Sequence, residues 1–441
     1  MNISPARIAA FEILVKIAAE KAFSSVLLPL YEEKLEAKDR ALCHEITLGT
    51  LRRQIYLDAI IEKLSNGKKL DSIVKVILRI ALYQLSFLDK IPAHAAINDA
   101  VNLTQKAKKT SAKGLVNAVL RRFTREKIEL VFADEFERIS VETSHPRWLI
   151  ERWNGQFGLA ETEKLAAANN ETPVSVFRLT NKSDENTVGT LMKLDLEITE
   201  SEIVENAWKV ANSNQMLRLY ADDGKIYFQD EGSQLIAHSV NLQSGESFLD
   251  VCAAPGSKAT FVARKKEKGK KQKEAAPSLL VAGDFYEHRT KILQVNCRRQ
   301  GMSNINILRY DAERDLPFAG ESFDVVLLDA PCSGTGTIRH NPEIRYFLEE
   351  KDFAELPIKQ LRILKNASKV LKTNGRLIYS TCSLEREENE AVAEEFLKAN
   401  EDFIKVQPKV PARFLTSESY ARTYPQSDKT DGFFIAEFEK K

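Results

Sequence analysis

Cysteine is scarce in this chain, and its few copies are widely separated: Cys43, Cys252, Cys297, Cys332 and Cys382. They are too few and too dispersed for the disulfide framework of a small secreted protein. No C-x-x-C pair provides the ligand spacing of a structural zinc site. The sequence therefore predicts a cytoplasmic protein with reduced thiols and no bound metal.

Long uncharged apolar runs are lacking as well. The N-terminal stretch is apolar but is interrupted by Glu12, Lys16 and Glu20, so it has no uncharged core of the kind found in a signal peptide. No later stretch reaches the length of a transmembrane helix. We therefore expect no membrane partner, and nothing in the sequence indicates an obligate protein partner.

The chain has almost no net charge, with 64 Lys and Arg against 63 Asp and Glu, but the charge is unevenly distributed. Residues 1–127 hold 22 basic residues against 13 acidic ones, a surplus of +9. Such a surplus favours nucleic acid as a partner, although a basic half can also be a solvated surface.

The length of 441 residues predicts two or three domains. In residues 1–127, segments such as "PARIAAFEILVKIAAE" repeat apolar residues at spacings of three and four, which predicts an all-helical bundle. Residues 128–240 mix helical and strand-like segments, and we interpret them as a small α/β connector. In residues 241–441 short apolar strands alternate with helices, which predicts a mostly parallel sheet covered on both faces.

Two segments of this last domain depart from that alternation. The terminal stretches "DFIKVQ" and "GFFIAEFE" are expected to form an antiparallel pair at one edge of the sheet. Residues 264–278, "RKKEKGKKQKEAAPS", carry seven basic residues in their first ten and bury almost nothing apolar. We expect them to form a mobile loop, whose contact with RNA stays open.

Polar residues follow the predicted parallel strands. The loop "CAAPGSK", residues 252–258, leads from the first strand into a helix that starts near Ser257, where small residues and free N–H groups let a ligand approach. Asp284, Asp311 and Asp329 follow the next three strands. Because ligands bind at the carboxyl ends of parallel strands, we expect these groups to share one site.

The loop matches neither G-x-G-x-x-G nor a Walker P-loop, which counts against nicotinamide and ATP. An adenosine-containing ligand with a carboxylate and no phosphate fits better, and S-adenosylmethionine is one. The stretch "DAPCSGTG" places Cys332 beside the last of the acids. Taken alone, this cysteine is compatible with a core thiol, a metal ligand, half of a disulfide or a nucleophile.

Three motifs in this order, "CAAPGSK", "DAPCSGTG" and "YSTCS", resemble the signatures of the RNA (cytosine-5) methyltransferases. The N-terminal segments "DRALCHEITLGTLRR", "LYQLSFLD" and "KGLVNAVLRR" resemble a NusB-like RNA-binding domain. The combination resembles the RsmB (Sun/Fmu) family of bacterial ribosomal RNA methyltransferases. This resemblance covers nearly the whole chain and is strengthened by "CSGTGTIRHNPEIRY" and "DGFFIAEF".

The resemblance implies a class I S-adenosylmethionine methyltransferase fold, Rossmann-like and catalytic, for residues 241–441, behind a NusB-like domain in residues 1–127. It makes Cys382 the attacking thiol and Cys332 the thiol that assists product release. It assigns cofactor contacts to Cys252, Ala253, Ala254, Pro255, Gly256, Ser257, Lys258, Asp284 (ribose), Asp311 (adenine) and Asp329 (between cofactor and target base). Two departures from the family pattern are Ser257, in place of a second glycine, and the basic insertion.

The implied reaction transfers a methyl group from S-adenosylmethionine to carbon-5 of a cytidine in 16S ribosomal RNA, through an adduct of Cys382 with carbon-6. The attacking group must be a thiolate, and the predicted helix "EREENEAVAEEFLKA" after Cys382 is expected to favour it through its N-terminus. The alternatives are the same chemistry on transfer RNA and a non-catalytic RNA-binding or ribosome assembly factor. DNA is disfavoured, because the DNA enzymes use the cysteine of their Pro-Cys motif as the nucleophile.

Overall fold

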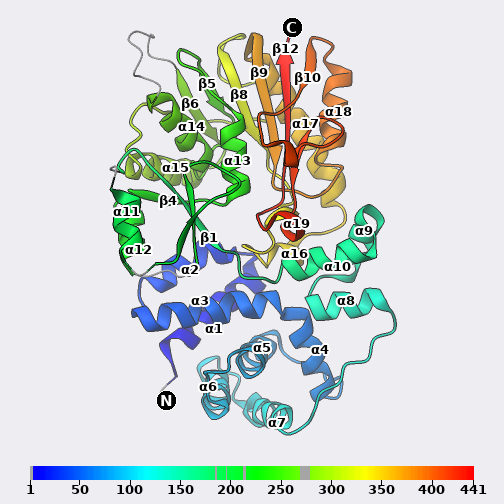
Figure 1. Ribbon diagram of the computed structural model, residues 1–441. Coiled ribbons are helices and arrows are strands. Elements are labelled where there is room, and N and C mark those ends of the chain that lie inside the picture. Colours follow the sequence, from blue (N-terminus) through cyan, green and yellow to red (C-terminus); the bar gives the residue numbers. More distant parts are fainter. Residues whose placement is uncertain (1–2, 184–185, 195, 212–214, 269–278) are drawn as a thin grey trace. The chain divides into compact units, whose positions relative to one another are not determined.

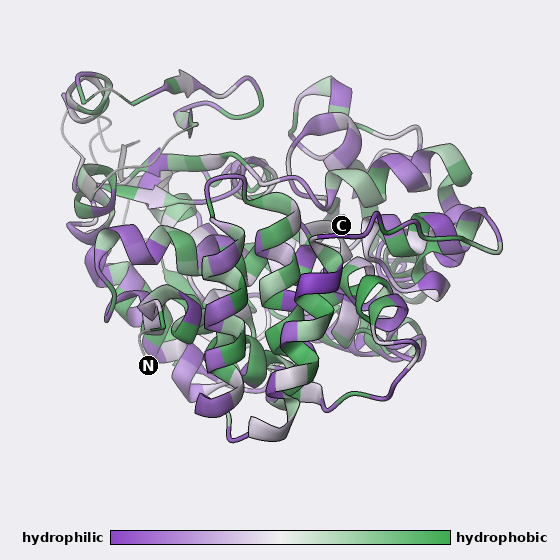
Figure 2. Ribbon diagram, turned by 90° about the horizontal axis from the view of Figure 1, so that it is seen from below, coloured by the Kyte–Doolittle hydropathy of each residue, from purple (hydrophilic) through white to green (hydrophobic). Residues whose placement is uncertain are grey.

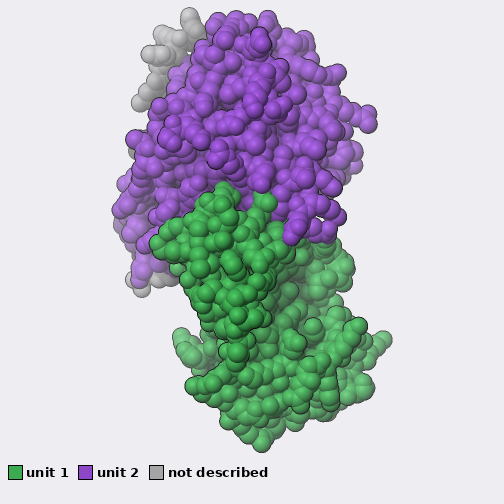
Figure 3. Space-filling view, turned by 90° about the vertical axis from the view of Figure 1, so that its right-hand side faces the viewer, with its two compact units in different colours: residues 1–172, 338–348 green, residues 173–337, 349–441 purple. Residues whose placement is uncertain are grey.

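The computed structural model describes residues 3–183, 186–194, 196–211, 215–268 and 279–441 (Figure 1). Its internal contacts divide the chain into two compact units (Figure 3). Unit 1 comprises Met1–Thr172 and Ile338–Leu348, and unit 2 comprises Pro173–Thr337 and Glu349–Lys441. None of the helices in the described ranges combines the length and the hydrophobicity that a membrane span requires.

Unit 1 is all-helical, as the apolar spacing of its first 127 residues predicts. Its helices carry both apolar and polar residues, which is typical of helices that bury one side (Figure 2). Buried residues such as Ile13, Ile46 and Ile77 form one core across these helices. The helices are α1 (Pro5–Glu20), α2 (Ser24–Glu32), α3 (Ala37–Arg52), α4 (Gln54–Leu64), α5 (Ser72–Phe87), α6 (Ala93–Lys106), η1 (Thr110–Ala112), α7 (Lys113–Phe123), α8 (Glu135–Thr143), α9 (Arg147–Phe157), α10 (Leu159–Ala168) and α16 (Ile344–Phe347).

Local sequence signals explain where several of these helices begin. Pro5 occupies the first turn of α1, where its missing N–H costs no hydrogen bond. The Asp71 side chain caps α5 by accepting a hydrogen bond from the Ile73 N–H at 2.9 Å. Pro92 is the residue directly before α6, where a proline ring does not interrupt helical hydrogen bonds.

The segment 338–348 belongs to unit 1 although it directly follows the Cys332 loop in the sequence. Arg345 in α16 is fully buried and donates hydrogen bonds to the Thr143 carbonyl at 3.1 Å and to Asn170 Oδ1 at 2.9 Å. The Glu343 carboxylate accepts hydrogen bonds from the Ser24 N–H and hydroxyl. These buried polar contacts make the segment part of the core of unit 1.

Unit 2 contains a small antiparallel sheet of order β2-β3-β1-β4. Its elements are β1 (Ser175–Leu179), α11 (Thr187–Met192), β2 (Ile198–Glu200), β3 (Ala207–Val210), α12 (Gln215–Asp222) and β4 (Ile226–Phe228). The predicted connector, 128–240, is thus divided: helices α8 to α10 belong to unit 1 and these strands belong to unit 2. The three domains bounded at 127 and 240 stay a prediction.

The large sheet of unit 2 has the order β10-β12-β9-β8-β5-β6-β7, and β11 pairs with β12. Strands β5 to β9 pair in parallel and end with β7 at one edge, whereas β10 and β12 form the predicted antiparallel pair at the other edge. The strands are β5 (Phe248–Asp250), β6 (Leu280–Asp284), β7 (Asn306–Arg309), β8 (Phe323–Asp329), β9 (Leu371–Thr381), β10 (Phe403–Val406), β11 (Ala421–Thr423) and β12 (Phe433–Lys440).

Helices cover both faces of this sheet, and each face has its own core. Phe261 and Leu293, from α14 and α15, pack on one face, whereas Leu364 and Phe396, from α17 and α18, pack on the other. The remaining elements are α13 (Glu231–Ser239), α14 (Ser257–Lys268), α15 (Glu287–Arg299), η3 (Thr335–Thr337), α17 (Asp352–Lys369), α18 (Glu390–Ala399), η4 (Ala412–Phe414) and α19 (Pro425–Asp428).

The basic segment differs from its predicted form at its start. Helix α14 continues to Lys268, so residues 264–268 are helical and are not part of a loop. Arg264 is buried and donates a hydrogen bond to the Leu179 carbonyl at 2.6 Å, so the first residue of the predicted loop is fixed within unit 2. Residues 269–278 of the predicted loop lie outside the described residues.

Candidate active site

The loop 251–256 leads from β5 into α14 beside the site, and Val251, Cys252 and Ala254 line the site's pocket. Gly256 has a φ of +103°, and a Cβ there would lie 2.5 Å from a methyl group of Leu293. A side chain at this position would be strained by the backbone conformation and would require the Leu293 methyl group to shift. The loop is fastened to β6 by the Ala253 N–H, which donates to the Gly283 carbonyl at 2.8 Å. Helix α14 begins at Ser257, as predicted.

A pocket of about 230 Å³ opens at the carboxyl ends of the parallel strands. Of the predicted cofactor residues, it is lined by Cys252, Ala254, Asp284, Asp311 and Asp329. The structure therefore brings together the three acids that follow successive strands. Ala253, Pro255, Gly256, Ser257 and Lys258 do not line it. Its other lining residues are Val251, Phe285, Tyr286, Arg289, Ala312, Glu313, Ala330, Pro331, Lys359 and Ile363.

The acids of the pocket are held by backbone and cationic donors. Asp284, only 5% exposed, accepts hydrogen bonds from the N–H groups of Ala254 at 3.2 Å and Tyr286 at 3.3 Å. Arg289 lies 3.4 Å from the same carboxylate. Asp311 accepts a hydrogen bond from the Glu313 N–H at 3.0 Å. Each carboxylate is thus oriented before a ligand enters.

Asp329 connects the pocket with the two cysteines. Its carboxylate accepts hydrogen bonds from Lys258 Nζ at 2.6 Å and from the Ser380 hydroxyl at 2.9 Å. Burial would lower the pKa of Lys258, but the Asp329 and Cys382 charges outweigh burial and raise this pKa above its ordinary value. Lys258 is therefore an ammonium ion, and it interacts favourably with negative charge on Cys382.

Cys332 and Cys382 lie side by side because β8 and β9, the strands that precede them, are paired neighbours. The two sulfur atoms are 3.2 Å apart, and both cysteines are free thiols. The hydrogen bond to Cys382 and then burial raise the pKa of Cys332 well above its ordinary value. Cys332 therefore keeps its proton, and the two sulfur atoms are within hydrogen-bond distance of each other.

The predicted helix directly after Cys382 is wrong in its start. Residues 386–389 form a turn, and α18 begins only at Glu390. The helix N-terminus therefore does not directly follow Cys382. Lys258 provides a positive charge that interacts with Cys382.

Both the N-terminal and the C-terminal part of the chain match known protein families. Residues 237–439 match the family model of the 16S rRNA methyltransferases RsmB/F, and residues 4–125 match that of the NusB family. Residues 145–216 match the ferredoxin-like domain of RsmF/B-like methyltransferases. A probable ribosomal RNA small subunit methyltransferase B of Bacillus subtilis (strain 168) is 32% identical over 98% of this chain and 98% of its own length. The chain belongs to the RsmB/F family of 16S rRNA methyltransferases.

Two further comparisons support this membership. The ribosomal RNA small subunit methyltransferase B of Escherichia coli (strain K12) is 32% identical over 96% of this chain and 95% of its own length. The crystal structure of PH0851 is similar with a TM-score of 0.84 and 27% identity, covering 100% of both chains. This RsmB/F family member is therefore an S-adenosylmethionine-dependent methyltransferase with a NusB-like domain.

The pocket of this family member fits S-adenosylmethionine. Asp284 and Asp311 offer carboxylate acceptors to hydroxyl and amino groups, and the apolar surfaces of Ala254 and Ile363 complete its walls. Asp250, at the end of β5, adds an acid that sequence reasoning missed. It is 1% exposed, and among the described residues neither of its carboxylate oxygens has a hydrogen-bond partner. Asp250 stands within the apolar run "FLDV", and no sequence motif distinguishes such an acid from the rest of a predicted strand.

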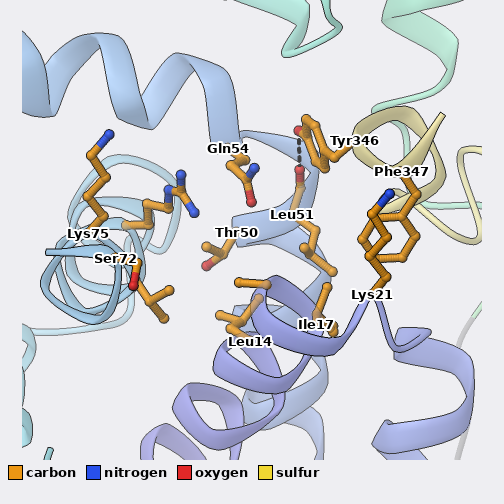
Figure 4. A pocket seen from close by; sticks show the side chains of 13 residues that line it. Leu14, Ile17, Lys21, Thr50, Leu51, Gln54, Ser72, Lys75, Tyr346 and Phe347 are labelled. Atoms are coloured by element: carbon orange, nitrogen blue, oxygen red, sulfur yellow. Dashed lines mark hydrogen bonds between the residues drawn. The ribbon is translucent and has the colours of Figure 1, made fainter. Parts of the chain in front are cut away.

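A second pocket, of about 320 Å³, lies within unit 1 (Figure 4). The hydroxyl of Tyr346 donates a hydrogen bond to the Leu51 carbonyl at its edge, and the ring of Phe347 forms another part of the wall. Its walls contain neither cysteine of the site and none of the predicted acids. We therefore do not assign this pocket to the methyltransferase reaction.

Replacing Asp284 by alanine is expected to weaken S-adenosylmethionine binding by about 10- to 100-fold, since a hydrogen bond to a charged group contributes roughly 1.5–3 kcal/mol. Calorimetric titration measures the change. Asp315→Ala is the matched control, because Asp315 is an exposed acid of the same unit and does not line the pocket. Unchanged affinity in Asp284→Ala would show that the ribose is held elsewhere.

Burial, and then the charge of Asp329, raise the pKa of Asp250 to about 8. In the unfolded chain this carboxyl loses its proton near pH 4, so the folded protein holds one proton more between these values. As the pH rises from about 5 to about 8, this group alone is expected to lower the free energy of unfolding by about 1.4 kcal/mol per pH unit. Asp250→Asn should remove that slope in urea unfolding curves, and an equal slope in both proteins would contradict the assignment.

Proposed function

We propose that this enzyme transfers a methyl group from S-adenosylmethionine to carbon-5 of a cytidine in 16S ribosomal RNA, in the cytoplasm, through a covalent bond between Cys382 and carbon-6. The observation that carries the proposal is the pair of free thiols 3.2 Å apart. They lie beside Asp329 and Pro331, which line the cofactor pocket. Two thiols in contact at a methyl-donor site fit a reaction with one thiol to attack and one to release.

The first step needs a thiolate at Cys382. Carbon-5 of cytosine is a poor nucleophile, and addition of a thiolate at carbon-6 makes it an enamine-like carbon that attacks an electrophilic methyl group. Bound S-adenosylmethionine supplies that methyl group. The Lys258 ammonium and the hydrogen bond from Cys332 both stabilise negative charge on the Cys382 sulfur.

The release step needs a base for the carbon-5 proton, and Cys332 becomes suited to it once the adduct forms. In the free enzyme, the hydrogen bond to Cys382 is the largest cause of its raised pKa. A sulfur bonded to carbon-6 carries no negative charge and is a weak acceptor, so the pKa of Cys332 falls when the adduct forms. Cys332 then loses its proton to solvent, its thiolate takes the carbon-5 proton, and the Cys382 thiolate leaves as the ring regains its double bond.

Asp329 and Lys258 act between cofactor and base. We infer that Asp329 accepts a hydrogen bond from the cytosine edge, while Lys258 balances its charge. The basic surplus of residues 1–127, together with their match to the NusB family, supports RNA recognition by unit 1.

The proposal is tested by incubating the enzyme with isotope-labelled S-adenosylmethionine and unmodified 16S ribosomal RNA or transfer RNA. Nucleosides from the digested RNA are then identified by mass spectrometry. We expect label in 5-methylcytidine from 16S ribosomal RNA. Label only in transfer RNA would overturn the substrate, and label in another nucleoside would overturn the cytosine chemistry.

A further inference from the structure

One buried carboxylate, Glu388, contacts the loops of both cysteines. It lies in the turn before α18 and is fully buried. In the described part of the chain its side chain accepts four hydrogen bonds, and none of the four donors is a charged group. A buried carboxylate without a cation is costly, so a specific task must explain its position.

The first set of donors comes from the Cys332 loop. The N–H of Ser333, the residue after Cys332, donates to Glu388 Oε2 at 2.9 Å, and the Ser333 hydroxyl donates to Oε1. Gln360 Nε2 donates to Oε2 at 2.8 Å and also to the carbonyl of Pro331, the residue before Cys332, at 3.0 Å. The backbone is thus held on both sides of Cys332.

The second contact comes from the Cys382 loop. The hydroxyl of Ser383, the residue after Cys382, donates to Glu388 Oε1 at 2.6 Å. The same hydroxyl accepts a hydrogen bond from the Glu385 N–H at 3.1 Å, which fixes its direction. The Ser333 and Ser383 hydroxyl oxygens are 3.0 Å apart on this one carboxylate. The two residues that follow the cysteines therefore meet at a common point.

We propose that Glu388 is a positioning residue that keeps the Cys332 and Cys382 sulfur atoms at reacting distance by tying Ser333 and Ser383 to one carboxylate. This inference rests on the proposed roles of the two thiols. A carboxylate suits the task because it only accepts hydrogen bonds, and all of its partners here are donors. An amide of the same size would turn an NH₂ group toward at least one of those donors.

The loops have further links that keep them folded without Glu388. The Leu384 N–H donates to the Thr335 hydroxyl at 2.9 Å, and the Gly336 N–H donates to the Cys382 carbonyl at 2.9 Å. Glu388→Gln is therefore expected to change the spacing of the sulfurs rather than to unfold the unit. Glu437→Gln is the matched control, because Glu437 is a buried carboxylate in β12 that is paired with Arg376 in β9.

Two measurements on the full-length protein test the proposal. The first is the rate at which diamide links the two thiols: each sulfur loses a proton, and the electron pair passes to the azo group to give a hydrazine. Peptide mapping identifies the Cys332–Cys382 product. We expect this rate to fall at least about 10-fold in Glu388→Gln and to stay unchanged in Glu437→Gln, since misplacement by about 1 Å already has large effects on rates.

The second measurement is steady-state methyl transfer. We expect kcat to fall about 10- to 100-fold in Glu388→Gln, with KM for RNA and S-adenosylmethionine within about twofold of the parent protein. Native linking rate and native kcat together would overturn the proposal. If Glu388→Gln does not fold, Ser333→Ala and Ser383→Ala each remove one hydroxyl contact and are expected to slow the linking reaction; native rates in both would overturn it. If the linking rate is slowed in Glu388→Gln but Cys382→Ala still transfers methyl groups, the proposed function is refuted and the positioning role of Glu388 is retained.

Discussion

Replacement of Cys382 by alanine is expected to abolish methyl transfer to RNA, by a factor on the order of 10⁴ or more, because the proposed nucleophile for carbon-6 is lost. S-adenosylmethionine binding should remain, since Cys382 does not line the cofactor pocket. Transfer of labelled methyl groups to RNA measures the first effect, and calorimetric titration measures the second.

Cys297→Ala is the control for this variant. Cys297 is a buried, free cysteine of the same unit, in α15, and has no part in the proposed reaction. It should retain activity close to that of the parent protein. Normal methyl transfer by Cys382→Ala would refute its assignment as the nucleophile and direct attention to Cys332.

Replacement of Cys332 by alanine is expected to trap a covalent protein–RNA complex. The Cys382 thiol attacks and the methyl group is transferred, but the carbon-5 proton then lacks its base, so the adduct cannot decay at its normal rate. The complex should survive denaturing electrophoresis as a band of reduced mobility that disappears after digestion with ribonuclease.

The double variant Cys332→Ala/Cys382→Ala tests the origin of that band. Without the Cys382 sulfur no adduct can form, so the band should be lost. Free RNA alone in the single variant would refute the release role of Cys332. A band that persists in the double variant would show that another residue of the chain forms the bond.

Much of the site was predictable because it depends on strand order. Parallel strands place their carboxyl ends at one edge of a sheet, and so Asp284, Asp311 and Asp329 were expected in one pocket and do line one. The start of α14 at Ser257 and the antiparallel pair of β10 and β12 also agree with local patterns. The roles of the individual site residues remain predictions until variants are measured.

The missed features depend on contacts that no local pattern encodes. Asp250 sits in an apolar strand, and its burial together with the charge of Asp329 raises its pKa. Glu388 belonged to the predicted helix after Cys382, yet it lies in a turn and is fully buried. Residues 338–348 read as part of the methyltransferase sequence, but Arg345 and Glu343 bury their charges in unit 1.

The sequence by itself determined the family, the cofactor, the helical first half and the parallel sheet of the second. Periodicity, strand-end acids and the three loop motifs are local properties of the chain, so they can be read directly from the linear sequence. Only the tertiary structure decided that the two sulfurs lie 3.2 Å apart and that Lys258 faces Asp329. It also decided that one buried carboxylate joins both cysteine loops. Those distances arise from the pairing of β8 with β9 and from contacts between side chains that are far apart in the sequence. Burial strengthens the electrostatic interactions and hydrogen bonds that these side chains make.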